Sequence, residues 1–559
     1  MSDADDLVET HRATLDAACR AIRERTYFSA FPESPSTRIW GEEAPAAGKA
    51  AFDALRGTTF GLPTAGGQGT VAPERPPYGI DLAVEYPHLR AAGVDQLVAA
   101  ARMAMPAWRA AGPLQRSVIG IEILNRINAR SFELAHAVMH TTGQSFVMAF
   151  QAGGAHALDR ALEAVAYAYD AMASVPTSVV WEKPRSKGEP QRLAKTFTIV
   201  PRGVGLVIGC TTFPTWNSYP GLFASLVTGN AVIVKPHPHA VLPLALTVSI
   251  ARDVLADYGF DPALLNLAVE DNGEGLASTL ATHPDIRIVD YTGSSSYGEW
   301  LESNARQAVV FTEKAGVNCV VIESTDDLAG MAANLAYSLA LYSGQMCTAP
   351  QTILIPRDGI ETEHGHRTVD EVVASLQGAL DTLLADPARA VGMLGAVVGD
   401  AVLDRLEATA KIGDVAIASR VIEHPEYPRA RVRTPLVVRV DADRDDVYAQ
   451  ECFGPIAFIV ETDGTADSLE RWQTITNSRG AITASVYSTD QAVLTSADHV
   501  ACEIGVSVSQ NLTSDVYVNQ SAAYSDYHAT GANPAANATL TDAAFVASRF
   551  RIVESRRPA

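Results

Sequence analysis

The sequence lacks the marks of a membrane protein, a secreted protein and a zinc protein. None of its six cysteines forms a CxxC pair, and no histidine cluster lies near one at the spacing of a zinc site. No apolar run approaches the roughly 18 residues that span a bilayer. The opening segment MSDADDLVETHR is acidic and lacks the apolar core of a secretion signal. We therefore expect a cytoplasmic protein with reduced cysteines, no metal site and no membrane partner.

Positive charge is also scarce. The chain has 43 Lys and Arg against 64 Asp and Glu, a formal net charge of −21. Such a surface repels a phosphodiester backbone, so nucleic acid is not an expected partner. The 559 residues, 47% of them hydrophobic and 19% charged, are typical of a globular chain that exceeds one core. We expect about three domains or subdomains.

Strand and helix patterns alternate twice along the chain. The strand-like segments GVGLVIGC, AVIVK, NLAVE and IRIVDYTG are separated by helical patterns, and VNCVVIE, QTILIP, FGPIAFIVE and ITASVYS begin a second series. Before them, residues 1–65 start as a helix and then lose any clear period, and helical patterns dominate from about residue 94. The alternation predicts α/β lobes with a parallel, doubly wound sheet.

The segment Ser343-Gly-Gln-Met-Cys347 carries the strongest chemical signal. It follows a long apolar helix pattern and precedes the strand QTILIP, which predicts a cysteine on a tight turn beside a cleft. A thiolate there could act as a nucleophile if its pKa is lowered locally. The alternative, an inert buried cysteine, is the commoner state of this residue.

Two further residues are candidates for the same reaction centre. Glu313 follows a strand-like run and could accept a proton from water or a thiol. The alternative is a loop glutamate paired with Lys314. Asn217, in FPTWNSYP, could donate its amide N–H to an oxyanion together with the backbone N–H of Cys347. The alternative is a structural asparagine in a turn between two prolines.

Three other segments could hold a phosphate-bearing cofactor. Tyr291-Thr-Gly293-Ser294-Ser-Ser-Tyr-Gly298 spans a strand-to-helix junction, where glycines and free helix N–H groups can approach a pyrophosphate. Lys235 ends a strand, and Glu451 and Phe453 lie in ECFGP. Each segment alone could equally be an ordinary turn. A metal at His237 and His239 is rejected, because no further ligand lies at suitable spacing.

Taken together and in this order, TWN, GNAVIVKP, YTGS, the Glu313 loop, GQMC and ECFGP resemble the motifs of the aldehyde dehydrogenase superfamily. The resemblance runs from about residue 95 to 555. It implies that Cys347 attacks the aldehyde carbonyl, that Asn217 binds the oxyanion and that Glu313 activates water. It also implies a set of residues around NADP or NAD: Trp216, Lys235, Gly293, Ser294, Gly298, Glu451 and Phe453.

Segments outside these motifs are similar to one branch of the superfamily, the phenylacetic acid degradation (PaaN) group. They are RTYFSAFPESPS, PERPPYGIDLAVEYP and DYHATGANPAANATLTDAAFVASRFR. The similarity implies oxidation of a ring-cleaved semialdehyde, free or as a coenzyme A thioester, in aromatic catabolism. The chain departs from the superfamily motifs in Pro214-Thr-Trp-Asn217, one residue longer than usual, and in Glu313-Lys-Ala-Gly316. Pro238 stands where NAD-preferring members carry a glutamate, which favours NADP.

The resemblance also implies a domain organisation. Residues 1–65 form a family-specific extension, 66–315 an NAD(P)-binding domain and 316–500 a catalytic domain. Residues 501–559 return to the cofactor domain and end in an oligomerisation tail, which joins a hairpin at 183–201. Edge strands of this kind pair between subunits, so we expect a homodimer or homotetramer.

Three other functions stay open at this point. A coenzyme A-acylating dehydrogenase would share the cysteine and the cofactor, although the presence of Glu313 favours water as acyl acceptor. A cysteine hydrolase or thioesterase would bind no nicotinamide, but no histidine is placed by a motif as a base for Cys347. A non-catalytic scaffold would keep only the fold.

Overall fold

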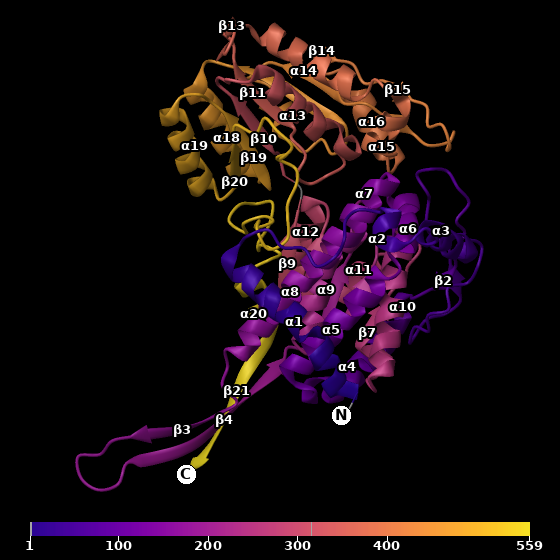
Figure 1. Ribbon diagram of the computed structural model, residues 1–559, viewed down its shortest axis with the longest axis vertical. Coiled ribbons are helices and arrows are strands. Elements are labelled where there is room, and N and C mark those ends of the chain that lie inside the picture. The colour runs from indigo at the N-terminus through magenta and orange to yellow at the C-terminus, as the bar shows by residue number, and fades with distance from the viewer. Residues whose placement is uncertain (1–2, 315) are drawn as a thin grey trace.

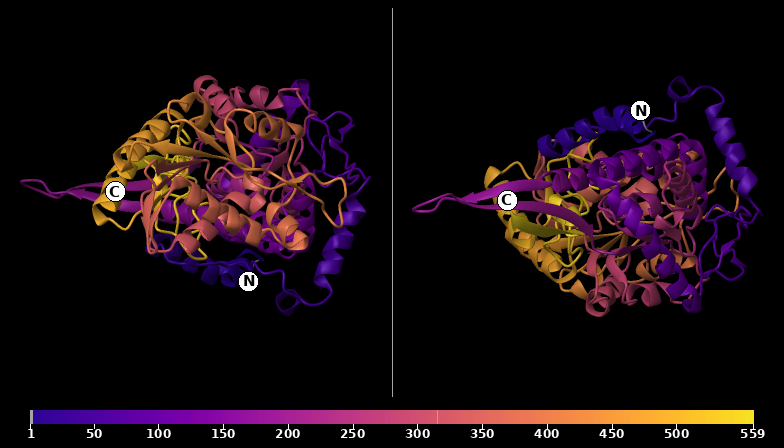
Figure 2. Two further views of the ribbon diagram at one scale, coloured as in Figure 1. Left: turned by 90° about the horizontal axis from the view of Figure 1, so that it is seen from above. Right: turned by 90° about the horizontal axis from the view of Figure 1, so that it is seen from below.

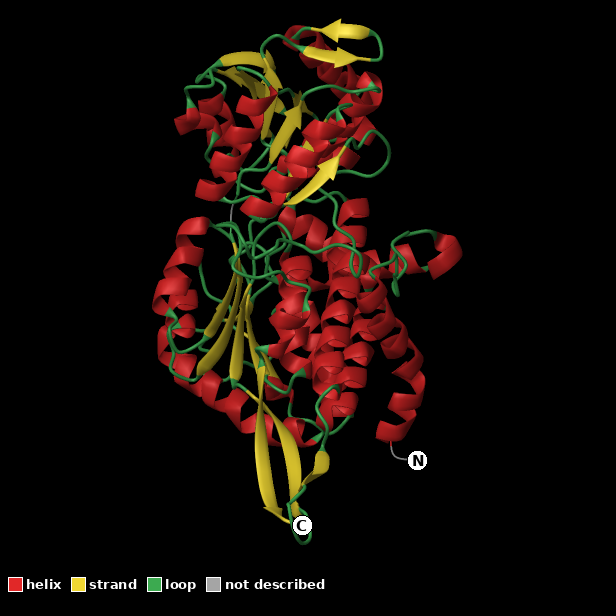
Figure 3. Cartoon of the chain, turned by 90° about the vertical axis from the view of Figure 1, so that its left-hand side faces the viewer, coloured by secondary structure: helices red, strands yellow, loops and turns green. Residues whose placement is uncertain are grey.

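The computed structural model describes residues 3–314 and 316–559. These residues form two lobes, each built around a mainly parallel sheet, and a narrow antiparallel sheet that extends away from the larger lobe (Figures 1 and 3). The loops at one end of the larger lobe's sheet lie between the lobes (Figure 3). In the described residues, no helix is long and apolar enough to cross a membrane.

The larger lobe holds a five-stranded parallel sheet in the order β7-β6-β5-β8-β9. Its strands are β5 (Val204–Ile208), β6 (Ala231–Lys235), β7 (Leu265–Leu267), β8 (Ile286–Thr292) and β9 (Val309–Glu313). The connecting helices are α9 (Pro214–Val227), α10 (Leu242–Asp257), α11 (Leu276–Ala281) and α12 (Ser295–Asn304). The central strand β5 has neighbours on both sides from later crossovers, so the predicted doubly wound fold is confirmed.

Helix α9 includes the segment around Asn217, for which the sequence left a turn between two prolines as an alternative. The structure starts the helix at Pro214 and keeps Pro220 inside it. A proline in the first turn has a suitable φ and needs no N–H partner, so Pro214 can open the helix. Asn217 therefore lies in the first turn of a buried helix and not in an exposed turn.

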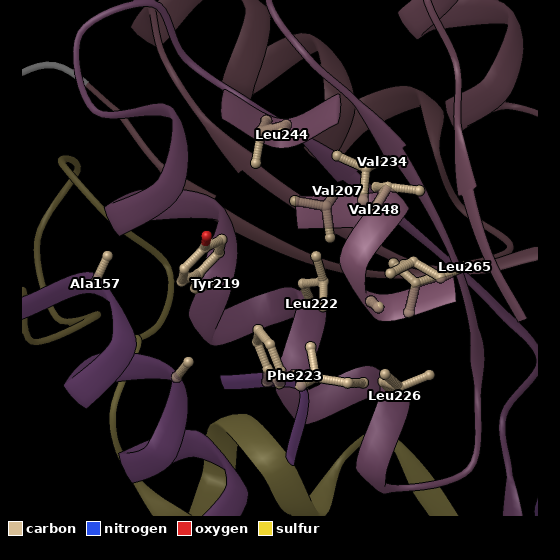
Figure 4. Close-up of a cluster of buried hydrophobic side chains, with 14 of the residues drawn as sticks. Ala157, Val207, Tyr219, Leu222, Phe223, Leu226, Val234, Leu244, Val248 and Leu265 are labelled. Carbon is tan, nitrogen blue, oxygen red and sulfur yellow. The ribbon is translucent and has the colours of Figure 1, made fainter. Parts of the chain in front are cut away.

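The core of this lobe is packed around α9, whose residues are all buried. Figure 4 shows side chains of α9 gathered against those of the sheet and of α10. The fully or almost fully buried members are Tyr219, Leu222, Phe223, Leu226, Val207, Val234, Leu265, Leu244 and Val248. Burying each large apolar side chain contributes about 1.5–3 kcal/mol, so this packing fixes the start of α9 relative to the sheet.

A layer of helices covers the other side of α9. It consists of α4 (Val94–Ala110), α5 (Gly112–Asn128), α6 (Ser131–Thr142), α7 (Phe146–Phe150) and α8 (His156–Ala173). A π-helical turn over Gln151–Ala155 joins α7 to α8, and α8 packs along α9. The helical stretch predicted from residue 94 is confirmed.

The second lobe holds a seven-stranded sheet in the order β14-β17-β18-β11-β10-β19-β20, parallel except for β14. Its strands are β10 (Cys319–Ile322), β11 (Thr352–Pro356), β14 (Asp414–Ile417), β17 (Leu436–Val440), β18 (Ile456–Thr462), β19 (Thr483–Tyr487) and β20 (Ser507–Gln510). Strand β20 lies beyond the boundary predicted at residue 500. The boundary predicted at residue 315 falls outside the described residues.

Helices cover this second sheet, and two short antiparallel strand pairs lie outside it. The helices are α13 (Leu328–Ala340), α14 (Val369–Leu383), α15 (Pro387–Leu394), α16 (Asp400–Thr409), α17 (Asp445–Tyr448), α18 (Thr465–Arg479) and α19 (Gln491–Ile504). The short strands are β12 (Ile360–Thr362), β13 (Gly365–Arg367), β15 (Val421–Ile422) and β16 (Val432–Arg433).

The N-terminal extension runs along the outside of the larger lobe (Figures 1 and 2). It contains α1 (Asp3–Glu24), α2 (Thr37–Trp40) and α3 (Ala44–Leu55), followed by the small pair β1 (Thr70–Val71) and β2 (Tyr86–Pro87). The helical start was predicted, but α3 was not. Only one residue of α3, Phe52, is buried, so its sequence carries little apolar periodicity.

The projecting sheet joins the predicted hairpin to the chain's last strand. Strand β4 (Gln191–Pro201) pairs with β3 (Ser178–Lys183) on one side and β21 (Phe550–Pro558) on the other, and α20 (Ala543–Ala547) precedes β21. Both views of Figure 2 show this sheet extending from the body. The predicted combination of hairpin and tail is confirmed.

Candidate active site

Cys347 lies on a turn whose backbone is strained. The preceding 3-10 turn (Leu341–Gly344) contains Tyr342 and Ser343 at φ 52° and 50°, a region costly for residues with a side chain. Buried hydrogen bonds hold the strain: the Tyr342 hydroxyl donates to the Thr142 carbonyl, and the Ser343 hydroxyl contacts two carbonyls at 3.0 Å. The turn that carries Cys347 is thus held by tertiary contacts and not by local preference.

Asn318 fixes the same turn from the second sheet. Its amide nitrogen donates to the carbonyl of Cys347 at 2.8 Å and to that of Ala349 at 2.9 Å. Its amide oxygen accepts the N–H groups of Ile482 and Thr483 at 3.0 and 3.1 Å. Sequence analysis missed Asn318, whose only signal was a polar residue at the start of an apolar strand.

Asn217 and Glu313 meet from two elements of the larger lobe. Glu313 is the last residue of β9 and is 2% exposed, and Asn217 reaches it from the first turn of α9. The Asn217 amide nitrogen donates to Glu313 Oε1 at 3.3 Å, and the thiol of Cys210 donates to Asn217 Oδ1 at 3.6 Å. The structure therefore brings all three predicted reaction-centre residues together, and Glu313 is not the solvent-exposed partner of Lys314.

His528 completes this group, and sequence analysis did not select it. Its Nε2 lies 3.2 Å from Glu313 Oε2, and both side chains are almost fully buried. The ring of Trp216 packs edge-on against His528, with centroids 4.6 Å apart. Ligand-type atoms of Glu313, Cys347 and His528 all lie within 4.8 Å of one another, the one such set in the described part of the chain.

The surroundings shift the pKa values of the Glu313 carboxylate and the Cys347 thiol in opposite directions. Burial raises the pKa of Glu313, but the His528 imidazole and hydrogen bonds from Cys347 and Asn217 outweigh it, so the pKa lies below its ordinary value. Burial and the negative charge of Glu313 raise the pKa of Cys347 well above its ordinary value. This differs from the predicted lowered pKa: the thiol is protonated and faces an ionised acceptor.

Two cavities meet at Cys347. One has a volume of about 520 Å³ and the other about 280 Å³, and both are lined by Cys347, Asn217 and Phe213. His528 lines the larger cavity and Glu313 the smaller, so their contact joins the two. A half-buried thiol between two cavities can be reached from one side by a substrate and from the other by a cofactor.

The larger cavity is mostly aromatic and apolar. Its walls include Phe28, Phe213, Trp216, Tyr337 and Met346, and none of its described lining residues is Lys or Arg. The N-terminal extension supplies part of the wall with four residues: Tyr27, Phe28, Ser29 and Glu33. The region 1–65 predicted as an extension thus forms part of this cavity.

Asp159 on α8 holds the extension in place. Its carboxylate accepts the Ser29 hydroxyl at 2.7 Å and the Ala30 N–H at 2.9 Å. Burial raises the pKa of Asp159 to about 6, although these two donors lower it. The wall formed by the extension is therefore pinned by a buried carboxylate directly beside the cavity.

The smaller cavity contains most of the predicted cofactor residues of the β8–α12 and ECFGP segments. Gly293, Ser294, Glu451 and Phe453 line it together with Thr292. Gly293 has no room for a Cβ, which would lie 2.4 Å from the Tyr291 hydroxyl. Burial raises the pKa of Glu451 to about 7, although Arg405 lowers it.

Three of the predicted cofactor residues, Gly298, Trp216 and Lys235, do not line the smaller cavity. Gly298 does not line the smaller cavity, because the Lys314 side chain packs against it and a Cβ would lie 2.5 Å from Lys314 Cγ. Trp216 lines the larger cavity, on the opposite side of Cys347. Lys314 itself pairs with Glu302 at 3.0 Å. These placements leave Gly298 a packing role and put Trp216 on the wall of the larger cavity.

Lys235 has a buried partner that the sequence did not indicate. The Lys235 ammonium forms an ion pair with Glu270, which follows β7, and both side chains are 6% exposed. Lys235 ends β6 and Glu270 lies three residues beyond the neighbouring parallel strand β7, at the carboxyl edge of the sheet where α/β folds bind nucleotides. The set of donors and acceptors fits a dinucleotide: a lysine and a carboxylate for ribose or phosphate, and a cavity beside Cys347.

Comparison with known proteins agrees with this arrangement. A sequence profile described as the aldehyde dehydrogenase family matches residues 65–531. A crystal structure of an NAD-dependent aldehyde dehydrogenase from Burkholderia multivorans is 53% identical, covers 99% of both chains and has a TM-score of 0.97. N-succinylglutamate 5-semialdehyde dehydrogenase of Paraburkholderia xenovorans is 28% identical over 388 residues, 68% of this chain and 73% of that protein.

More distant structures share the fold alone. A 1-pyrroline-5-carboxylate dehydrogenase from Thermus with bound NAD is 18% identical, with a TM-score of 0.72 over 96% of this chain and all of that one. The profile match over most of the chain and the 53% identity to a dehydrogenase across its full length assign the family. The chain belongs to the aldehyde dehydrogenase family and is an oxidoreductase that uses NAD(P).

Proposed function

We propose that the protein oxidises an aldehyde to its carboxylic acid, with Cys347 as nucleophile and Glu313 as general base. The observation that carries this proposal is the position of Cys347, where a substrate-sized cavity and a cofactor cavity meet beside an ionised carboxylate. A hydrolase would need only one of these cavities, and a scaffold would need neither.

In the first step the Cys347 thiol gives its proton to Glu313 while its sulfur bonds to the aldehyde carbon. The raised pKa of Cys347 means that the nucleophile forms only as the proton leaves. The Asn217 amide and the Cys347 backbone N–H are the donors available to the developing oxyanion. Bound nicotinamide would accept the hydride that this carbon then loses, leaving a thioester on Cys347.

Before the second step Glu313 releases the proton of the first step to solvent. It then takes a proton from water as the water oxygen bonds to the thioester carbon. The carbon–sulfur bond breaks, the carboxylic acid leaves, and the proton held by Glu313 returns to the Cys347 sulfur. The buried Glu313, with three polar neighbours, favours water as acyl acceptor over coenzyme A.

For the cofactor we propose NAD, held by Lys235, Gly293, Ser294, Glu451 and Phe453. Pro238 stands where NAD-preferring members carry a glutamate. Because that carboxylate would repel a 2′-phosphate, its absence favoured NADP in the sequence. Glu270, however, places another carboxylate beside Lys235. The Burkholderia multivorans protein, described as NAD-dependent, supports the same choice.

For the substrate we propose a ring-cleaved semialdehyde of aromatic or phenylacetate catabolism whose carboxyl group is masked as a coenzyme A thioester. The segment RTYFSAFPESPS, which resembles the PaaN group, contains the extension residues that line the larger cavity. A semialdehyde with free carboxylates, such as that in the name of the N-succinylglutamate relatives, would find no lysine or arginine among the described lining residues. An apolar acyl chain next to the aldehyde fits these walls.

The test measures absorbance of reduced nicotinamide with NAD or NADP and a panel of aldehydes. We expect NAD to be preferred and kcat/KM for uncharged medium-chain or aryl aldehydes to exceed that for short semialdehydes with free carboxylates by about tenfold or more. Product analysis with added coenzyme A should find the free acid. An acyl-coenzyme A product would instead identify an acylating dehydrogenase, and no reduction with any aldehyde would exclude the proposal.

We further propose a cytoplasmic homodimer or homotetramer assembled through the projecting sheet. All six cysteines are free, as in a reducing compartment. Both outer strands of that sheet expose apolar residues, among them Val180, Trp181, Ile552 and Val553. Light scattering should give a mass of two or four chains, and Val180→Lys/Trp181→Lys should lower it. A monomeric wild-type mass would contradict the assembly.

A further inference from the structure

In the described residues, the imidazole Nε2 of His528 and one carboxylate oxygen of Glu313 face each other and have no other hydrogen-bond partner. Nε2 of His528 and Oε2 of Glu313 are 3.2 Å apart, and neither atom has a hydrogen bond to another described residue. Leaving a buried donor and a buried carboxylate oxygen with no other partner is costly. A role in stability alone does not explain why both atoms face the reacting thiol.

We propose that His528 is a positioning residue that keeps Glu313 ionised and directed at Cys347, so that Glu313 can act as base in both steps. The inference rests on the proposed roles of Cys347 and Glu313. Glu313 must lose the proton of the first step before it can activate water in the second. An imidazole in contact with Oε2 favours the carboxylate each time.

Hydrogen bonds to α8 hold the loop that carries His528, and they fix the position of the imidazole beside Glu313. The backbone N–H of Tyr524 donates to Glu163 Oε1 at 3.0 Å, and Arg160 donates to the Ser521 hydroxyl at 2.5 Å and to the Asp526 carbonyl at 3.3 Å. Arg160 and Glu163 are fully buried and paired at 2.8 Å. The residues of this loop have no helix or strand of their own, so the buried pair on α8 sets the position of the imidazole.

Several titratable or charged groups surround the pair, on elements of both lobes. Cys347 faces Glu313 from its turn, Cys210 from the loop after β5, and Glu451 acts on Cys347 from the ECFGP segment. On the other side the Arg160 guanidinium lies 5.3 Å from the ring of Trp216, which separates it from His528, and it is neutralised by Glu163. Lys314, next to Glu313, is neutralised by Glu302. His528 is therefore the basic group in direct contact with Glu313.

The sign of the pH effect follows from the lowered pKa of Glu313. The enzyme needs the carboxylate, so activity is lost as pH falls through that pKa. Removing the imidazole removes a neighbour that lowers this pKa and leaves burial, which raises it. The acid limb of the kcat profile should therefore move to higher pH in a His528 variant.

The experiment compares wild type with His528→Asn, His528→Gln and Glu313→Gln in two assays. Stopped-flow absorbance with NAD and an aldehyde separates hydride transfer from thioester hydrolysis. Turnover of p-nitrophenyl acetate without dinucleotide separates acylation of Cys347 from deacylation. We expect His528→Asn to keep a stoichiometric burst that forms more slowly, and to slow the following steady state by about ten- to hundredfold, a part of the effect of a general base. Glu313→Gln should slow it further.

The control is His11→Asn. His11 is also buried and pairs with a glutamate, Glu122, at 2.9 Å, but it lies in α1 and does not line either cavity. It should leave the burst, the steady state and the pH profile unchanged. The longer side chain of His528→Gln can bring an uncharged amide donor nearer to Glu313 than that of His528→Asn, so it should recover part of the rate and none of the pH shift.

Two results would overturn the inference. Wild-type steady-state rates and an unchanged acid limb in His528→Asn would show that the imidazole only fills space. Equal loss of acylation, deacylation and NAD binding would show that His528 maintains the fold. The proposed function fails separately, if Cys347→Ala or Glu313→Gln leaves aldehyde oxidation intact whatever the His528 variants do.

Discussion

Replacing Cys347 with alanine is expected to lower aldehyde-dependent nicotinamide reduction by at least about 10⁴-fold, because no other group can form the covalent intermediate. The two cavities meet at this sulfur, and the cofactor cavity has thirteen other lining residues that the change does not touch. NAD should therefore bind with an unchanged Kd in a fluorescence titration. The loss should fall on kcat, since the aldehyde site keeps its aromatic walls.

Cys502→Ala is the matched control for this variant. Cys502 is exposed on α19, so its removal should leave turnover unchanged. A second comparison uses alkylation: iodoacetamide should abolish wild-type activity and modify Cys347, which borders two cavities and has Glu313 as proton acceptor, before the buried Cys19 and Cys319. Substantial NADH production by Cys347→Ala would contradict the assignment of the nucleophile.

Local patterns predicted the α/β lobes because strand and helix periods repeat within short windows. The apolar segments AVIVK and IRIVDYTG became β6 and β8 of the parallel sheet, and the hairpin joined the tail as expected. Cys347, Glu313 and Asn217 could be selected because each lies in a short motif at the end of an element. Their closeness follows from the fold, since β9, α9 and the turn before β11 converge where the lobes meet.

The residues that sequence analysis missed contact partners that are far away in the sequence. His528 contacts Glu313, Asn318 holds the Cys347 carbonyl, and Asp159 pins Ser29, 130 residues away. None of these contacts leaves a periodic or spacing signal in a single sequence. The same reason explains Glu270, which changes the cofactor expectation only because β7 lies beside β6.

The pKa of Cys347 could not be predicted from its motif, because it depends on residues that only the fold brings close. A cysteine on a glycine-rich turn suggested a lowered pKa, yet the folded chain buries the thiol and places a carboxylate against it. Both influences disfavour the thiolate. The reactivity of this site therefore depends on a proton acceptor brought from another strand, Glu313 on β9, and not on the local backbone around the cysteine.

Replacing Arg549 with methionine is expected to destabilise the larger lobe by about 3–5 kcal/mol, the usual cost of leaving a buried charge unpaired. Arg549 is fully buried and binds Asp290 of β8 through two hydrogen bonds of 2.8 and 2.6 Å. Its guanidinium also lies between the rings of Phe311 and Phe545, 4.5 and 4.1 Å from their centroids. Urea unfolding followed by tryptophan fluorescence should show a lower first midpoint.

The reverse test separates the unpaired charge from lost packing. Asp290 is buried and packs directly against Gly221 of α9, where a Cβ would lie 2.5 Å from the Asp290 carboxyl carbon. Arg549→Met/Asp290→Asn removes both charges and should be more stable than Arg549→Met alone. If the double variant is no more stable, packing against the two phenylalanine rings dominates. Because Arg549 precedes β21, Arg549→Met should also loosen the projecting sheet and lower the oligomeric mass.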